Sequence, residues 1–156
     1  MSAPARPLIH LQVENAQFTL QLPDTQPGQA LAIASLPAIR RYLQHEPATA
    51  IEIETAIAAI EDVLIPVVKR LPARANLVTH AAAIGQILVA ASLPNRAEMC
   101  LDRAAVELLF NRLAAMAYGT PPAQAGLPAD RDFAASLLIL RELLHHGGFD
   151  AITIQA

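Results

Sequence analysis

Apolar residues recur at intervals of three and four from residue 49 to residue 71, a spacing that predicts one long amphipathic helix. Thr49 stands three residues before Glu52, and in this capping-box pattern each side chain satisfies a backbone N–H left free at the helix start. Pro72 marks the end of the helix. Pro66 lies inside it, and because the apolar stripe keeps its phase across this proline, we expect a kink there rather than an end.

Residues 8–22 alternate instead between apolar and polar side chains, which predicts a β-hairpin that turns at Asn15 and Ala16. This register places Val13 opposite Phe18. A lone hairpin is marginally stable in water, so we expect its apolar face to pack on helices and a third strand to join it. The other face of the hairpin is polar and carries His10, Gln12, Gln17, Thr19 and Gln21.

The rest of the chain predicts four more helices, one more strand and two loops. The expected helices are residues 35–43 with Ser35 as cap, the Ala-rich residues 76–92 at the centre of the fold, residues 96–118, and a last helix that Asp130 or Asp132 caps and Gly147 and Gly148 end. Residues 149–155 form the strand. The loops are residues 23–29, with a turn at Pro27 and Gly28, and residues 120–129, a lid or contact loop.

The fold class expected from these elements is α+β and predominantly α. It is a helical bundle of four to five helices, with a small antiparallel sheet formed by the N-terminal β-hairpin and the C-terminal strand. A chain of 156 residues can bury a core without disulfides or metals, so we expect residues 1–156 to form a single domain.

The composition narrows the classes of partner. Hydrophobic residues make up 54% of the chain and charged residues only 16%, so the surface is poor in charge and favours a homo-oligomer, with a dimer preferred, or a protein partner. The net charge is −3 and Trp is absent, which argues against binding to nucleic acid.

The sequence also indicates the cellular compartment of the protein. A single cysteine cannot form an intramolecular disulfide, and the first residues lack the apolar run of a secretory leader. The most hydrophobic window, residues 77–93, is short for a bilayer span and is interrupted by polar residues. We therefore expect a cytoplasmic protein that does not bind a membrane.

One short motif suggests a metal. Glu142 and His145 form a Glu-x-x-His pair, and helical di-iron sites use two such pairs together with two further carboxylates. No second pair exists in the chain, although Glu54, Glu61 and Glu107 could add carboxylates. The alternative interpretation is that His145 and His146 complement the carbonyl end of their helix. On this balance we expect no metal and no cofactor.

Three residues are candidates for catalysis. His80 falls on the apolar stripe of its expected helix, where it is either a hydrogen-bonded core residue or a general base that Glu107 or Asp62 orients. Cys100 lies near the start of the next expected helix, where the helix dipole favours a thiolate, although a small buried side chain is the simpler interpretation. The sequence has no glycine-rich phosphate loop and no nucleophile elbow.

Two main hypotheses for function follow. The first is a small cytoplasmic oligomeric protein that acts as an adaptor, an accessory subunit or a regulator, without catalysis of its own, and the lack of catalytic motifs favours it. The alternative is a helical domain that binds a small molecule or a metal, or is an enzyme, with a pocket near His80, Glu107 and Cys100 closed by residues 120–129. A secretion-accessory or chaperone-like protein is a third idea that rests on composition alone.

Overall fold

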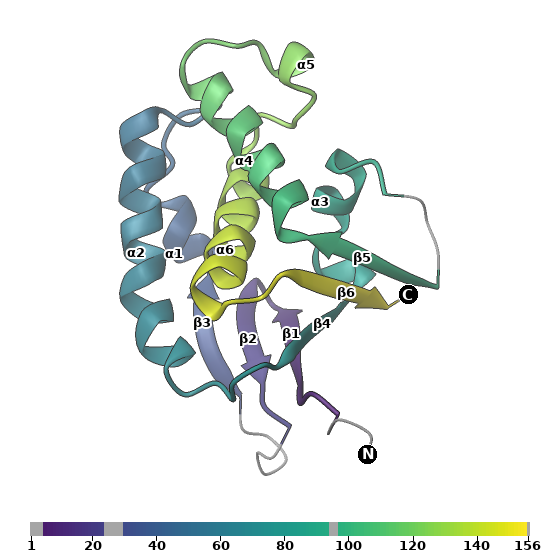
Figure 1. Ribbon diagram of the computed structural model, residues 1–156. Coiled ribbons are helices and arrows are strands. Elements are labelled where there is room, and N and C mark those ends of the chain that lie inside the picture. Colours follow the sequence, from purple (N-terminus) through teal and green to yellow (C-terminus); the bar gives the residue numbers. More distant parts are fainter. Residues whose placement is uncertain (1–4, 24–29, 94–96, 156) are drawn as a thin grey trace.

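The fold is a mixed β-sheet whose core face is covered by helices, as seen in the computed structural model, which describes residues 5–23, 30–93 and 97–155 (Figure 1). The sheet has six strands in the order β3-β2-β1-β4-β6-β5 within the described residues. The strands are β1 (Leu8–Glu14), β2 (Gln17–Gln21), β3 (Leu31–Ser35), β4 (Asn76–His80), β5 (Glu98–Asp102) and β6 (Ala151–Gln155).

The hairpin of β1 and β2 forms as the alternation predicts. Val13 pairs with Phe18 and Leu11 with Leu20, which confirms the predicted register. Asn15 and Ala16 have φ angles of 51° and 62°, the positive values that a type I′ hairpin turn requires. A third strand does join the hairpin, but it is β3, which pairs antiparallel with β2, and not the C-terminal strand. Strand β4 is parallel to both of its neighbours, β1 and β6, so long crossovers must connect these three strands.

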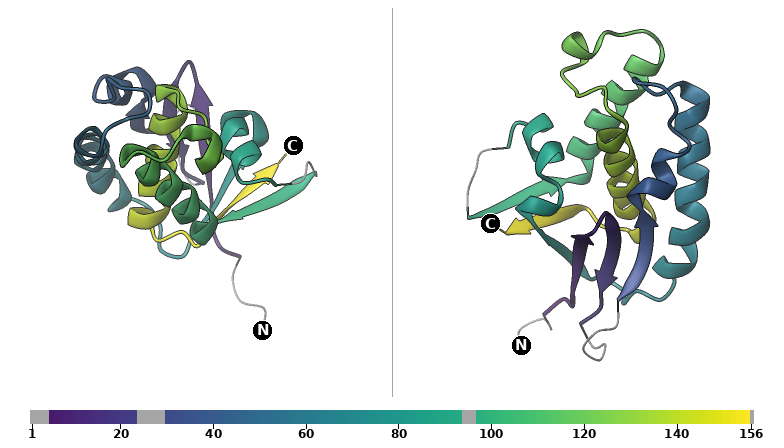
Figure 2. Two further views of the ribbon diagram at one scale, coloured as in Figure 1. Left: turned by 90° about the horizontal axis from the view of Figure 1, so that it is seen from above. Right: turned by 180° about the vertical axis from the view of Figure 1, so that it is seen from behind.

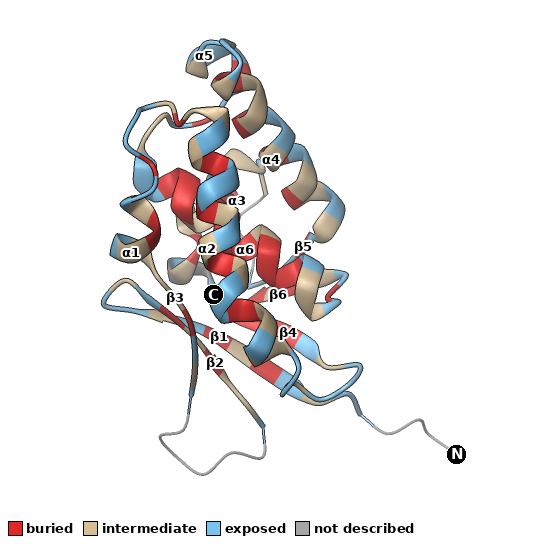
Figure 3. Cartoon of the chain, turned by 90° about the vertical axis from the view of Figure 1, so that its left-hand side faces the viewer, coloured by how far each residue is buried: buried red, intermediate tan, exposed pale blue. Residues whose placement is uncertain are grey.

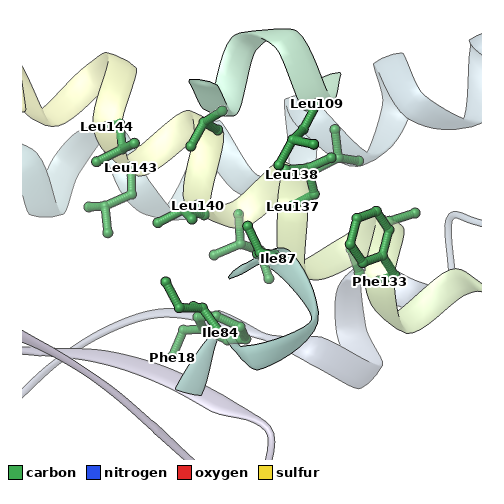
Figure 4. Packing of buried hydrophobic residues seen from close by; sticks show 14 of the residues in the cluster. Phe18, Ile84, Ile87, Leu109, Phe133, Leu137, Leu138, Leu140, Leu143 and Leu144 are labelled. Carbon is green, nitrogen blue, oxygen red and sulfur yellow. The ribbon is translucent and has the colours of Figure 1, made fainter. Parts of the chain in front are cut away.

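The helices lie on one side of the sheet, as the further views show (Figure 2). They are α1 (Leu36–Arg40), α2 (Ala50–Val68), α3 (Gly85–Ala90), α4 (Arg103–Ala117), α5 (Pro122–Ala125) and α6 (Arg131–Gly147), with a 3₁₀-helix, η1, at Ala81–Ala83. Helix α6 packs against both α2 and α4, and it is buried around most of its circumference. It is therefore the central element of the core (Figure 4).

The two faces of the sheet differ in burial. Ile9, Leu77 and Ile152 point into the core from three adjacent strands and are at most 1% exposed. The opposite face carries the polar positions of the same strands and is partly or fully exposed except at Val78 (Figure 3). One side of the sheet thus supplies the core, and the other is polar.

The expected helical bundle with a small sheet is wrong, and the largest error lies in residues 76–92. Asn76 to His80 form the central strand β4, followed by η1 and the short helix α3. Leu77, Val78 and Thr79 are all buried because β4 lies inside the sheet between β1 and β6. A strand buried on both faces reads as a continuous apolar run, which periodicity alone does not distinguish from a buried helix.

The expected helix over residues 96–118 is correct only in its second part. Met99 and Leu101 are buried while Glu98, Cys100 and Asp102 are exposed, the alternation of an edge strand, β5. Helix α4 begins at Arg103, and its predicted stripe is confirmed, since Val106, Leu109, Leu113 and Met116 are buried. The N-terminal hairpin also does not pair directly with the C-terminal strand, because β4 separates β1 from β6.

The local predictions at the helix ends are confirmed for α2 and α6 but not for α1. Thr49 and Glu52 form the capping box of α2, and the helix continues through Pro66 to Val68; the kink stays a prediction. Asp130 caps α6, which ends at Gly148 in the left-handed conformation. Ser35 stands at the start of α1 but makes no capping hydrogen bond, and the helix ends before residue 43. The turn expected at residues 27 and 28 lies outside the described residues.

Among the helices of the described residues, none has the length and apolar character needed to cross a bilayer.

Candidate functional site

The parallel strands β1, β4 and β6 all end on the same side of the sheet, where their carboxyl ends lie next to one another. Ligands of open α/β sheets bind outside these carboxyl ends, because the loops and helix starts that follow the strands are found there. Strand β4 ends at His80, and the chain then passes through η1 directly into α3. The segment after β4 is therefore the first place to look for a binding site.

A cavity of about 910 Å³, which we call the α3 cavity, adjoins this segment. Helix α3 contributes Gln86 and Val89, helix α4 contributes Arg112, and the α5 segment contributes Pro122 and Leu127. The wall is mainly apolar, with a few polar groups from Gln86, Ser92 and Arg112. This composition is typical of small-molecule sites, in which apolar side chains supply contact area and a few polar groups fix orientation.

A second cavity of about 330 Å³ shares Gly85 and Gln86 with the α3 cavity. It is lined by residues 82–87 and by Ser136 of α6. Gln86 thus contributes to the walls of both cavities. With Ser136 on one side and Arg112 on the other, the pair of cavities presents hydroxyl, amide and guanidinium donors that suit an anionic ligand.

The segment predicted as a lid or contact loop does line a cavity. Pro122, Ala123, Gly126, Leu127 and Pro128 all belong to the wall of the α3 cavity. The segment also contains the short helix α5, which ends at Gly126 with a φ of 72°, an angle that favours glycine.

The three residues expected to surround a pocket do not line either cavity. His80 is exposed at the end of β4, where it pairs in register with Gln155. Cys100 is exposed on β5, so it is neither a buried hydrophobe nor at a helix start. Both placements relied on helices that are strands in the structure.

Glu107 has a different partner from the one expected. It accepts a hydrogen bond at 2.9 Å from Arg141 of α6, and the Arg141 guanidinium also lies 3.8 Å from the centre of the Phe110 ring. Asp62 is exposed on α2.

A cluster of charged groups lies between α2 and α6. Glu142 is only 2% exposed; its Oε1 accepts a hydrogen bond at 3.0 Å from Arg141, and its Oε2 lies 3.1 Å from Nε2 of His146. The same nitrogen is 3.7 Å from Oε2 of Glu61. Burial raises the pKa of Glu142, and the neighbouring Arg141 charge opposes this effect.

The structure therefore does not bring the candidate metal ligands Glu142 and His145 together. His145 is exposed, and its neighbour His146, four residues after Glu142, faces the buried carboxylate instead. Positions three and four apart both lie on the same side of a helix, so the sequence did not distinguish the two histidines. Only the position of α2, which brings Glu61 to this side of α6, selects His146.

Solved structures identify the class of fold. The chain is similar to the Ppx-GppA enzyme of Aquifex aeolicus, with a TM-score of 0.69 and 10% identity over 97% of this chain. It is also similar to an exopolyphosphatase from Cytophaga hutchinsonii, with a TM-score of 0.66 and 14% identity over 97% of this chain. An exopolyphosphatase-like protein gives a TM-score of 0.57 and 15% identity over 98% of this chain.

The fold is thus the one seen in Ppx/GppA proteins, and the chain spans about half the length of these structures, 54%, 53% and 54% respectively. The sequence itself matches no known family model, and no curated protein is significantly similar to it.

The similarity corrects the first functional hypothesis. A helical-bundle adaptor without catalysis does not agree with a fold shared with exopolyphosphatases and related enzymes. The alternative, a domain that binds a small molecule, agrees better, although its pocket lies at α3 and α5 rather than around His80, Glu107 and Cys100.

Proposed function

We propose that this chain is one lobe of a phosphatase-type enzyme and that it binds a phosphate-bearing ligand in the α3 cavity. The observation that carries the proposal is the match of 97% of this chain to about half of a Ppx-GppA enzyme. Because the matched structure is about twice as long as this chain, the proposal includes a second lobe that closes the site and supplies further groups. A cytoplasmic location, expected from the single cysteine, belongs to the same proposal.

The donors around the cavity suit a phosphate group. The Arg112 guanidinium can form two parallel hydrogen bonds to phosphate oxygens, and the Gln86 amide and Ser92 hydroxyl can donate further ones. The apolar side chains of Val89, Pro122 and Leu127 can contact an apolar part of the ligand. In this proposal the chain's residues bind and orient the ligand.

The test uses the purified 156-residue protein and linear tripolyphosphate. Isothermal titration at low salt should show one-to-one binding, and Arg112→Gln should weaken it at least about tenfold because a charge-assisted bidentate contact is lost. The matched control is Arg70→Gln, an exposed arginine outside the cavity, which should change the dissociation constant less than about twofold.

Release of inorganic phosphate in the presence of Mg²⁺ tests the catalytic part of the proposal separately. The binding proposal fails if tripolyphosphate does not bind, or if Arg112→Gln and Arg70→Gln behave alike. The catalytic proposal fails if tripolyphosphate binds but no inorganic phosphate is released. Release must also be absent in an assay to which a protein that supplies the second lobe has been added.

A further inference from the structure

The charged cluster between α2 and α6 has no part in the proposed phosphate site. Glu142 and His146 lie in the last turns of α6, whereas Ser136, which borders the smaller cavity, lies in its first half. At 1.5 Å per residue, Glu142 is about 9 Å further along the helix axis than Ser136. The cluster therefore requires an explanation of its own.

The positions of three donor atoms match a metal site. One ligand atom from each of Glu61, Glu142 and His146 lies within 4.8 Å of the other two. Nε2 of His146 is 3.1 Å from Oε2 of Glu142 and 3.7 Å from Oε2 of Glu61. Ligands of a tetrahedral ion with bonds of about 2.0–2.1 Å are separated by roughly 3.3–3.5 Å, so small side-chain rotations suffice to bind one.

The cluster contains more acidic than basic groups. Glu107 and Glu142 share the guanidinium of Arg141, and Glu61 lies 3.7 Å from Nε2 of His146. Only Glu142 of these three carboxylates is buried. A divalent ion beside it would add positive charge, which a buried carboxylate favours.

The cluster also has the supporting contacts that metal sites need. Arg141 binds Oε1 of Glu142 and leaves Oε2, the oxygen nearest His146, available as a ligand. Phe110 and Glu107 in turn fix Arg141. Such outer contacts orient the ligands before the ion arrives. Glu61 and His146 have side chains that are 34% and 26% exposed, so an ion can enter from solvent.

We propose that Glu61, Glu142 and His146 form a binding site for a divalent transition-metal ion, with Zn²⁺ the ion that fits best. One imidazole and two carboxylates are ligands that zinc accepts, and three protein ligands leave a fourth position for water. Two of the ligands come from α6 and one from α2, so the ion links these helices. The proposal does not depend on the phosphate site.

The test measures Zn²⁺ binding to the full chain without an affinity tag and without any phosphate ligand. Isothermal titration should show one ion per chain, and Co²⁺ should give the visible absorption of a tetrahedral site. Glu61→Gln and His146→Gln should each raise the dissociation constant at least about tenfold, since each removes a ligand. Both side chains are partly exposed, so both variants should fold.

His145→Gln is the matched control, because His145 is adjacent on the same helix but exposed. It should change the affinity less than about threefold, and circular dichroism should show that all variants fold. The site is rejected if no Zn²⁺ binds at about 1 mM, or if the affinity is unchanged in both Glu61→Gln and His146→Gln. It is also rejected if His145→Gln weakens binding as strongly as His146→Gln.

Discussion

Glu52 shows at the scale of one residue how a carboxylate fixes the start of a helix. Its Oε1 accepts a hydrogen bond from the backbone N–H of Thr49 at 2.9 Å, and its Oε2 accepts one from Gln44 at 2.6 Å. His45 lies 3.1 Å from the same Oε2. Burial alone would raise the pKa of Glu52, but these hydrogen bonds outweigh it and lower the pKa to about 2.

We predict that Glu52→Gln lowers the free energy of unfolding by about 1–3 kcal/mol at pH 7, because charge-assisted hydrogen bonds are replaced by neutral ones. The ordinary pKa is 4.5 and the folded value is about 2, so this stability is complete above pH 4.5 and is lost as the pH falls through 2. Urea unfolding of both proteins at several pH values measures the difference.

Glu54→Gln is the control for this prediction, because Glu54 is exposed on the same helix and its replacement should change stability by less than about 0.5 kcal/mol. A difference between wild type and Glu52→Gln that stays constant down to pH 2 would contradict the assigned cause.

Asp102 illustrates the boundary between two elements. In the structure it is the last residue of β5 and the cap of α4, where its Oδ1 accepts a hydrogen bond at 2.7 Å from the N–H of Ala105. In the helix expected over residues 96–118 the same residue would lie in the interior. Replacing Asp102 by alanine should therefore have opposite effects on the free energy of unfolding in the two arrangements.

We predict that Asp102→Ala destabilises the protein by about 0.5–2 kcal/mol, because the N–H of Ala105 loses its acceptor. In a continuous helix the same change would instead stabilise by about 0.5 kcal/mol, since Ala has the higher helix propensity. Asp102→Asn should retain most of the stability, as Asn also caps helices. Denaturant unfolding of the three proteins decides between a strand and a helix before Arg103.

The elements predicted correctly are those with a strong local signal. The hairpin has strict alternation, and α2 and α6 begin at residues whose side chains cap them, Thr49 and Asp130. Strand β4 has no such signal, since its three middle residues are all buried and show no alternation. The predictions for the candidate site were likewise correct only where the element itself was predicted correctly. Residues 120–129 were expected near a pocket and line one, while His80 and Cys100 were misplaced together with their elements.

The arrangement of the whole sheet depends on pairings that the sequence does not mark. Strand β4 inserts between β1 and β6, which are more than 130 residues apart in the chain. Parallel pairing of this kind is decided by the packing of α2 and α6 on one face, not by a turn. The charged cluster of Glu61, Glu142 and His146 could not be predicted for the same reason, because Glu61 and His146 lie close together only when these two helices pack.

The two edges of the sheet differ in charge, and this difference indicates where a second copy could pair. Strand β5 forms one edge and carries Glu98 and Asp102, which would face like charges in a symmetric antiparallel pair. Strand β3 forms the other edge and has the sequence LAIAS, with no charge. Uncharged edges favour pairing with another strand, whereas charged edges resist it.

We predict that the 156-residue chain forms a dimer through β3, because an uncharged edge strand can pair with the same strand of a second copy. Native mass spectrometry should give twice 16.6 kDa. Ala32→Lys places a charge on the uncharged edge at an exposed position and should produce the monomer, while Cys100→Lys on the opposite edge should remain a dimer. A monomeric wild type excludes the dimer, and a dimer that survives Ala32→Lys places the interface away from β3.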